Sequence, residues 1–153
     1  MTLSEIKEKL HLLAGPLLES RRAFLVDVAI RNERGVALLQ VFVDTDLGIK
    51  VGECSEISRE LGKVLDEAGF FERPYHLEVS SPGIDKPLRL LRQYHKNVGR
   101  RFKVAYRLEG KPATLIGKLE SILDDRLTFS PENGEPLTLE FSQIIESKEE
   151  LPW

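Results

Sequence analysis

The sequence predicts an α+β protein in two parts: an α-β-β-α-β domain at residues 1–83 and a small all-β domain at residues 84–153. Three observations predict this division. The first half alternates helical and strand-like hydrophobic spacing, the second half contains only short, closely spaced strands, and Pro82-Gly83 makes a corner between them. A length of 153 residues suits one ordinary domain or two small ones.

The chain opens with a predicted amphipathic helix. Thr2 and Glu5 have the spacing of a capping box, in which each side chain accepts a hydrogen bond from the other residue's backbone. Apolar residues at positions 3, 6, 10, 13 and 17 form one helical stripe, typical of a core-facing surface. We expect Gly15-Pro16 to end or interrupt this helix.

A β-hairpin and a second helix follow. Residues 24, 26, 28 and 30, and after a turn at residues 32–35 residues 39, 41 and 43, are apolar and alternate with their neighbours. This pattern predicts two strands, each with one buried face made of these residues. The second helix runs from about residue 53 to 68 and is followed by Gly69 as a C-terminal cap. Cys54 falls on its apolar side, so we expect a buried, inert thiol.

A third strand at residues 75–80 leads into the junction between the two domains, near residues 81–90. Its first proline favours extended geometry at the preceding serine, and Pro-Gly suits a type II turn. The segment is either an interdomain hinge alone or a hinge that is also part of a binding surface. We assign to the junction Ser80, Ser81, Pro82, Gly83, Asp85 and Pro87.

Beyond the junction, one or two helical turns at residues 88–94 precede a series of short strands. Strands are expected at residues 101–108, 114–123, 126–129 and 137–141, with a short last strand at 143–147. Four or five strands in about 55 residues favour a small closed barrel or a sandwich, since closure hides the edges of such a sheet.

Charge is distributed unevenly along the chain. Residues 86–111 hold nine Lys or Arg and a single acid, which gives +8, whereas the whole chain has a net charge of −3. Such a block is either a solvated face or a patch that attracts an anionic partner. The candidate RNA-binding or particle-binding residues are Lys86, Arg89, Arg92, Lys96, Arg100, Arg101, Lys103 and Arg107.

Spacing groups these cations. Arg101, Lys103 and Arg107 fall on one face of a predicted strand, and Arg89, Arg92 and Lys96 share a face if their segment is helical. Lys and Arg contacts to phosphates supply affinity without sequence specificity. Tyr94 and Tyr106 lie among these cations and could stack on bases, although core packing suits Tyr106 better.

No catalytic or metal-binding motif is recognised. Residues 44–55 fail as a calcium loop, because the sixth position is not glycine and the twelfth is not glutamate. The three histidines lie on separate elements, and a single cysteine excludes an internal disulfide. Ser80 and Ser81 have no base placed by the sequence, so a hydrolase is the least favoured reading. We expect no enzyme activity, no cofactor and no metal.

The residues that carry a family resemblance cover most of the chain. The most specific stretch is Tyr75-His-Leu-Glu-Val-Ser-Ser-Pro-Gly-Ile-Asp-Lys-Pro-Leu88. Supporting stretches are Val41-Phe-Val-Asp44, Cys54-Ser-Glu-Ile-Ser-Arg-Glu-Leu61 with Leu65-Asp66, and Val98-Gly-Arg-Arg-Phe-Lys-Val104. In this order and spacing the sequence resembles the bacterial ribosome maturation factor RimP family.

The resemblance implies two helices on one face of a three-stranded sheet, followed by an Sm-like (SH3-type) barrel. It also implies a cytoplasmic, non-catalytic factor that binds the immature small (30S) ribosomal subunit and aids its maturation. The implied direct partner is the twelfth small-subunit ribosomal protein, with rRNA contacts, no membrane, and a monomeric state. The alternative is a protein–protein adaptor whose barrel binds a basic protein or peptide, with RNA contact incidental.

Overall fold

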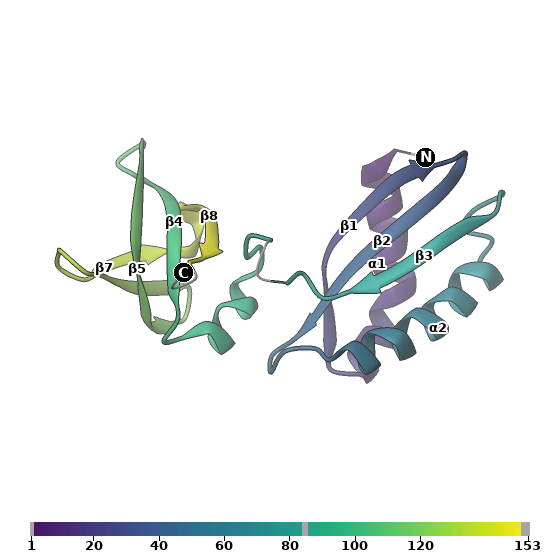
Figure 1. The fold of residues 1–153 in the computed structure, drawn as a ribbon, viewed down its shortest axis with the longest axis horizontal. Coiled ribbons are helices and arrows are strands. Elements are labelled where there is room, and N and C mark those ends of the chain that lie inside the picture. The colour runs from purple at the N-terminus through teal and green to yellow at the C-terminus, as the bar shows by residue number, and fades with distance from the viewer. Residues whose placement is uncertain (1, 84–85, 151–153) are drawn as a thin grey trace. The chain divides into compact units, whose positions relative to one another are not determined.

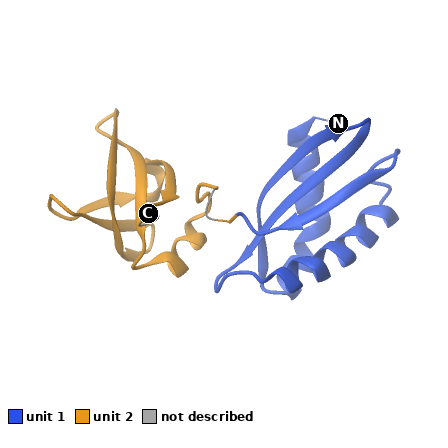
Figure 2. Cartoon of the chain, in the orientation of Figure 1, with its two compact units in different colours: residues 1–82 blue, residues 83–153 orange. Residues whose placement is uncertain are grey.

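The computed structural model describes residues 2–83 and 86–150. The chain forms two compact units, residues 1–82 (unit 1) and 83–153 (unit 2), shown in Figures 1 and 2. Each unit has its own hydrophobic core and is described separately below. The α+β fold class predicted from the sequence is confirmed.

Unit 1 has the predicted α-β-β-α-β order. Its elements are α1 (Leu3–Ser20), β1 (Ala23–Glu33), β2 (Val36–Thr45), α2 (Val51–Glu67) and β3 (Tyr75–Ser80). The strands form one sheet in the order β1-β2-β3, with β1 antiparallel and β3 parallel to β2. The parallel pairing follows from α2, which carries the chain back along the sheet before β3 begins (Figure 1).

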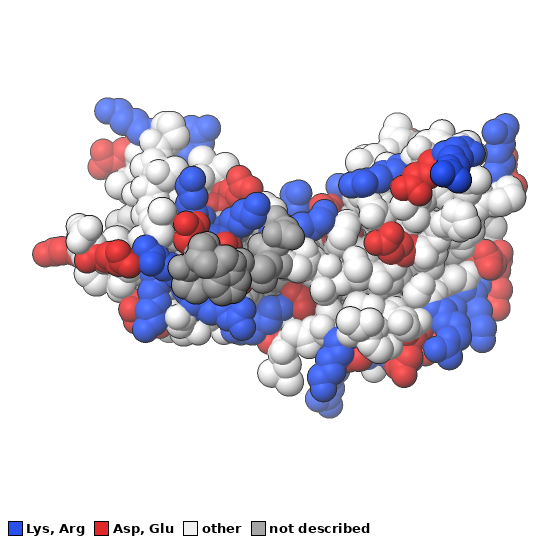
Figure 3. Space-filling view, in the orientation of Figure 1, with Lys and Arg blue, Asp and Glu red and all other residues white. Residues whose placement is uncertain are grey.

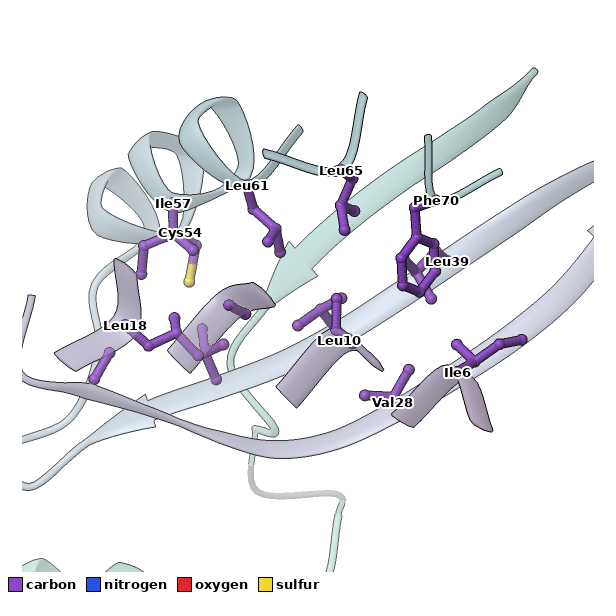
Figure 4. Close-up of a cluster of buried hydrophobic side chains, with 14 residues drawn as sticks. Ile6, Leu10, Leu18, Val28, Leu39, Cys54, Ile57, Leu61, Leu65 and Phe70 are labelled. Atoms are coloured by element: carbon purple, nitrogen blue, oxygen red, sulfur yellow. The ribbon is translucent and has the colours of Figure 1, made fainter. Parts of the chain in front are cut away.

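The core of unit 1 lies between the sheet and its two helices (Figure 4). From α1 it takes Ile6, Leu10 and Leu18, each at most 6% exposed. From α2 it takes one face, and Cys54 lies on that face as predicted. The strands add their helix-facing side chains, which are Ala23, Val28, Leu39, Val41 and Val43. Alternate residues of β2 therefore face the helices, as the period of a strand requires.

The capping box at the start of α1 is confirmed. Glu5 N donates to Thr2 Oγ1 at 3.2 Å, and Thr2 N donates to Glu5 Oε1 at 3.4 Å. The expected break at Gly15-Pro16 is wrong, because α1 continues through Pro16 to Ser20. Pro16 is exposed, and the residue four positions before it, Leu12, is 80% exposed. The carbonyl that the proline leaves without a helical donor therefore lies on the solvent side, where water replaces the missing bond.

The first strand departs from simple alternation. Its register with β2 shifts between Leu25 and Asp27, which marks a β-bulge. Leu25 packs against the core together with Val28 and Ile30, whereas Phe24 is buried but is not part of that core cluster. A bulge inserts one residue and reverses the face of everything beyond it. The expected single face made of residues 24, 26, 28 and 30 is therefore wrong before the bulge.

Unit 2 is built on a five-stranded antiparallel sheet. The strands are β4 (Arg101–Leu108), β5 (Lys111–Leu123), β6 (Arg126–Pro131), β7 (Leu137–Glu140) and β8 (Ile144–Glu149). Their order in the sheet is β7-β6-β5-β4-β8, so the last strand returns to pair with the first (Figure 1). A short 3₁₀ turn, η3 (Phe141–Gln143), joins β7 to β8. The sheet curves around a core that includes Tyr94, Phe102, Leu119, Phe129 and Leu139.

The sheet of unit 2 has two ends rather than a continuous ring of strand pairing. Within residues 86–150, β7 and β8 are the end strands and form no ladder with each other. The predicted antiparallel all-β architecture is therefore present as a curved sheet, whereas the closed ring of strands expected for a barrel is not formed within residues 86–150. The Sm-like assignment stays a prediction. Strong curvature comes from a close crossing at Gly117 on β5, where an added Cβ would lie 2.9 Å from the backbone of Ser130.

The segment before β4 forms two 3₁₀ turns, η1 (Leu91–Gln93) and η2 (His95–Asn97), instead of an α-helix. Buried Gln93 organises this segment, because its Oε1 accepts from Arg89 N and Leu90 N, both at 2.8 Å. Asn97 Nδ2 donates to Gln93 O at 2.6 Å. Helical turns are present, but Arg89 precedes η1 and Arg92 and Lys96 lie on separate turns, so the single helical segment on which the three cations would share a face is not formed.

Candidate nucleic-acid interface

The outward face of the β4–β5–β8 part of the sheet gathers basic side chains. Strand β4 points Phe102, Val104 and Tyr106 into the core and its alternate residues outward. Strand pairing places Arg101 directly opposite Lys118 of β5, and Lys103 directly opposite Lys148 of β8. All four side chains are exposed. We call this set, Arg101, Lys103, Lys118 and Lys148, the cationic face.

Two like-charged pairs in direct cross-strand register are unfavourable for the fold itself. Directly opposite residues have Cβ atoms about 5 Å apart, and like charges at that separation destabilise a sheet. The strand's core packing does not require these cations, because they lie on the opposite side from Phe102 and Val104. A surface that keeps four neighbouring positive charges at a cost to its own stability is typical of an anion-binding site.

Acidic residues border the cationic face without covering it. Arg101 Nη1 lies 2.9 Å from Glu132 Oε1 in the β6–β7 turn, where Glu132 is 69% exposed. At the end of β8, Arg100 Nη1 lies 3.1 Å from Glu149 Oε1. The Arg101–Glu132 pair is exposed, and exposed ion pairs contribute roughly 0–1 kcal/mol, so a phosphate can replace the Glu132 carboxylate at little cost. Figure 3 shows acidic side chains gathered at the outermost loop of this unit, with Lys and Arg between that loop and the rest of the unit.

The other predicted cations lie around this face. Arg107 is exposed near the end of β4, opposite Pro112, and Arg100 is exposed just before the strand. Arg89 and Arg92 are exposed in the 3₁₀ segment, whereas Lys86 and Lys96 are partly buried. The structure therefore joins Arg101 and Lys103 in one patch but does not order the residues before β4 along a common helical face.

The suggestion that Tyr94 and Tyr106 stack on bases is wrong. Tyr94 has no exposed surface and packs near Phe102 and Phe141, with ring centroids 6.4 and 6.0 Å away. Tyr106 is only 9% exposed and belongs to the same core. Burial raises the pKa of the Tyr94 phenol, so it stays neutral at physiological pH. Within the described part of unit 2, the cationic face offers charge without an aromatic surface.

The described junction residues after Ser80 belong to no helix or strand. Ser80 ends β3, Ser81 and Gly83 are exposed, and Gly83 adopts a φ of +70°, the left-handed conformation that glycine tolerates. Asp85 lies outside the described residues. Beyond Pro87 the chain joins the sheet of unit 2, where Leu88 N donates to Ser147 O at 2.8 Å. The role assigned to these residues as a stiff domain junction stays a prediction.

Groups that could perform chemistry are not assembled. Burial raises the pKa of the Cys54 thiol, which disfavours the reactive thiolate. Among residues 2–83 and 86–150, no three His, Cys, Asp or Glu side chains are placed to hold a metal ion. None of the helices in the same ranges has the length and apolarity needed to cross a lipid bilayer. The cationic face is therefore the feature from which a function can be argued.

Sequence reasoning missed two members of the cationic face, Lys118 and Lys148. Both lie outside the basic block at residues 86–111, and each has acidic neighbours in sequence. Only the pairing register of β5 and β8 brings them to Arg101 and Lys103. The sequence does indicate that Lys118 and Lys148 face outward, because each is next to a residue that faces the core, Leu119 and Ser147 respectively. It does not indicate which strands are neighbours in the sheet.

The fold and this face define a class: a small two-unit α+β protein with an exposed surface suited to anions. A comparison with protein-family models shows more. Residues 13–85 match the RimP N-terminal domain, a span that takes in the last eight residues of α1, the whole sheet of unit 1, α2 and the junction as far as residue 85. This match, over 73 of the 153 residues, supports the assignment of the chain to the RimP family of ribosome maturation factors.

Proposed function

We propose that the protein is a non-catalytic maturation factor for the small (30S) ribosomal subunit and that the cationic face of unit 2 binds rRNA in the immature particle. The match to the RimP family supports a role in ribosome maturation. The cationic face supports contact with RNA through phosphate groups. The single observation that carries the mode is the placement of Arg101 opposite Lys118 and of Lys103 opposite Lys148. Phosphate groups of RNA relieve the repulsion between these pairs on binding.

The domain division belongs to the same proposal. Unit 1, with the family match, and unit 2, with the cationic face, correspond to the domains proposed at residues 1–83 and 84–153. The residues proposed to contact the particle are the cationic face together with Lys86, Arg89, Arg92, Lys96, Arg100 and Arg107. The protein acts as a monomer in the cytoplasm, where immature subunits are available to it.

The proposed protein partner is the twelfth small-subunit ribosomal protein, which is basic. Unit 1 supports this part of the proposal, because residues 1–82 hold 14 acidic and 10 basic residues, a net charge of −4. Opposite net charges speed association and favour correct orientation. One factor can then bring together rRNA, through unit 2, and a basic ribosomal protein, through unit 1.

Co-sedimentation with free small subunits tests the proposal. In a quadruple variant, Arg101→Thr, Lys103→Thr, Lys118→Thr and Lys148→Thr, binding at low salt falls steeply. The dependence of log affinity on log salt concentration also flattens by up to about 3, since each lost phosphate contact removes roughly 0.7–0.9 from the slope. Threonine keeps the strand propensity and removes the charge. The control carries four exposed unit 1 cations changed to alanine, Arg22, Lys50, Arg59 and Lys63.

The same variants separate the two candidate functions. If the protein is an adaptor and RNA contact is incidental, the quadruple variant binds the particle as the parent does, and the proposal for the cationic face is overturned. Removal of like-charge pairs leaves the free energy of unfolding of the variant unchanged or raises it by about 0.2–1 kcal/mol per pair. Weaker binding by an equally stable or more stable protein is therefore not attributable to misfolding.

A further inference from the structure

A second cationic surface lies at the end of unit 1 where β3 begins, whereas the junction follows the other end of β3. The start of α1, the β1–β2 hairpin and the connection from α2 to β3 meet at this end of the unit (Figure 1). Between them is a hollow of about 660 Å³. Three basic side chains line it: Lys9 from α1, Arg31 from β1 and Arg73 from the α2–β3 connection.

These three cations have no ionic partner among the described residues. Within residues 2–83 and 86–150, none of them makes a salt bridge, although unit 1 carries more acids than bases. Two other cations of unit 1 are paired: Lys7 lies 3.5 Å from Asp27, and Arg21 contacts Glu56 and Glu60. The remaining five Lys and Arg of unit 1 also lack a salt bridge within the described residues, but they lie outside this hollow. The one acid lining the hollow is Glu72. An excess of unpaired positive charge in an acidic unit indicates an anionic ligand.

The hollow also has an apolar wall. Ile30, Ala37 and Phe71 line it beside the cations. Phe71 is held in place by Tyr75, with ring centroids 4.7 Å apart, and by an edge contact to Phe70 at 5.0 Å. Its ring is only partly buried, so part of it remains accessible. An accessible aromatic ring among cations is the combination that binds single-stranded nucleic acid, through base stacking and phosphate contacts.

We propose that this hollow binds unpaired RNA nucleotides, with Lys9, Arg31 and Arg73 on the phosphates and Phe71 beneath a base. The cationic face of unit 2 lacks an aromatic surface among the described residues, so the two surfaces are expected to bind different features of RNA. Unit 2 contacts the phosphate backbone regardless of pairing, and unit 1 selects single-stranded segments. This inference adds a second RNA contact to the proposed function and rests on it for the identity of the RNA as rRNA.

Fluorescence anisotropy with the full chain tests the site. The probes are a labelled oligouridine of about eight nucleotides, within the site sizes of small single-strand binding modules, and a labelled RNA duplex of the same length. In the triple variant Lys9→Ala, Arg31→Ala and Arg73→Ala, affinity for the oligouridine falls at least ten-fold, and the salt slope flattens by about 2. Affinity for the duplex changes less than two-fold. A matched triple variant, Lys50→Ala, Arg59→Ala and Lys63→Ala, retains the parent affinity for both.

A second variant addresses the ring. Phe71→Leu keeps an apolar side chain against the core and removes the stacking surface, so affinity for the oligouridine falls about ten-fold with the salt slope unchanged. Unfolding curves confirm that both variants are folded. The proposal is overturned if the triple variant binds oligouridine as the parent does, or weakens duplex binding equally. It is also overturned if a glutamate-rich peptide binds the parent hollow more tightly than RNA does.

Failure of the hollow as an RNA-binding site can be distinguished from failure of the proposed ribosomal function. The hollow is tested with free oligonucleotides, whereas the proposed function is tested by co-sedimentation with small subunits and by the unit 2 variant. Oligonucleotide binding that depends on Lys9, Arg31 and Arg73 without particle binding would reject the ribosomal role alone. Particle binding without any effect of the hollow variants on oligouridine would reject the hollow alone.

Discussion

At the scale of single residues, Tyr94 carries a phenol hydroxyl into the core of unit 2. The residue has no exposed surface, and its hydroxyl lies near that of buried Ser147, although neither hydroxyl makes a hydrogen bond of normal geometry within the described residues. A buried donor without a partner costs free energy that a purely apolar side chain avoids. The aromatic ring, which packs on Phe102 and Phe141, supplies the stabilising part of the interaction.

Tyr94→Phe therefore leaves the free energy of unfolding unchanged or raises it by up to about 1 kcal/mol, because the substitution keeps the ring and removes the unsatisfied hydroxyl. Urea unfolding followed by circular dichroism measures the change. Ser147→Ala is the companion variant, since it removes the other buried hydroxyl. A loss of more than about 1 kcal/mol in Tyr94→Phe would mean that the two hydroxyls bond to each other in solution.

Tyr75 makes the stability of unit 1 depend on pH in the alkaline range. Burial and the hydrogen bond from Tyr75 Oη to Asp66 Oδ1, at 3.0 Å, raise the pKa of Tyr75 to about 12. In the unfolded chain the pKa is about 10, so the folded protein binds the phenol proton more tightly. The resulting stabilisation is complete below about pH 10 and is lost as the pH rises through the folded-state value.

The free energy of unfolding of unit 1 is thus expected to fall between pH 10 and 12, and the fall is smaller in Tyr75→Phe. Urea unfolding at a series of pH values compares the two proteins, with the difference between parent and variant as the quantity of interest. Equal pH dependence in the two proteins would contradict the assignment to Tyr75. The variant also loses the bond to Asp66, so it is somewhat less stable than the parent at neutral pH.

Residue identity alone predicted the core positions well and the surface positions poorly. Cys54 was assigned to the core because helical spacing places it on the apolar side of α2, and local periodicity is enough for that conclusion. Lys118 and Lys148 could not be assigned to the cationic face, because their neighbours come from other strands. Tyr94 lies in a basic segment of sequence but points into the core, and charge along the chain does not report side-chain direction.

At the scale of elements, the close crossing of β5 and β6 depends on Gly117. A Cβ at this position would lie 2.9 Å from both the carbonyl carbon and the carbonyl oxygen of Ser130, and 3.0 Å from Pro131 N. Backbone atoms held in a sheet cannot move aside as the end of a flexible side chain can. Glycine here permits the curvature that lets one sheet surround the core of unit 2.

Gly117→Ala is expected to destabilise unit 2 by about 1–3 kcal/mol, the usual range for added volume in a packed site. Gly134→Ala is the matched control, because its added Cβ would meet only Pro131 side-chain atoms, at 3.8 Å or more, and its φ is not in the left-handed region. Thermal unfolding monitored by circular dichroism compares the two variants. Equal stability of both would show that β5 and β6 separate at this point in solution.

The existence and order of the elements were predictable, whereas their irregularities were not. Hydrophobic periodicity located all five elements of unit 1, because each buries one face against a common core. The bulge after Leu25 is a property of the pairing between β1 and β2, so no local pattern in β1 reports it. The continuation of α1 through Pro16 depends on which side of the helix faces solvent, and this is set by tertiary packing.

At the scale of the whole molecule, each unit has a complete core of its own. Unit 1 buries 14 hydrophobic residues in its cluster and unit 2 buries eight in its cluster. The sequence predicted the change of architecture at the junction, since helical spacing disappears beyond it. It could not predict whether the units fold independently, because that depends on the free energy each core supplies. Independent folding is proposed here from the two separate cores.

Paired substitutions test this independence within the full chain. Leu61→Ala removes a side chain with no exposed surface from the core of unit 1 and is expected to destabilise that unit by about 2–5 kcal/mol. Gly117→Ala acts on unit 2. If the units are separate domains, calorimetry of the parent shows two unfolding transitions, and each substitution lowers the midpoint of only one of them. The double variant then lowers both by the same amounts as the single variants, as expected for sites in separate cores that share no partners.

A single transition that both substitutions shift together would contradict independent folding, since it would mean that the two cores unfold as one cooperative unit. The result also bears on the binding proposals. Two domains that fold separately can each bind RNA without the other, and joining them in one chain raises the effective concentration of the second contact once the first is made. Disruption of either RNA surface should then weaken particle binding by a larger factor than it weakens binding of a short oligonucleotide that reaches only one surface. Comparison of co-sedimentation with oligonucleotide anisotropy, for the Lys9, Arg31 and Arg73 variant and for the cationic-face variant, measures that factor directly.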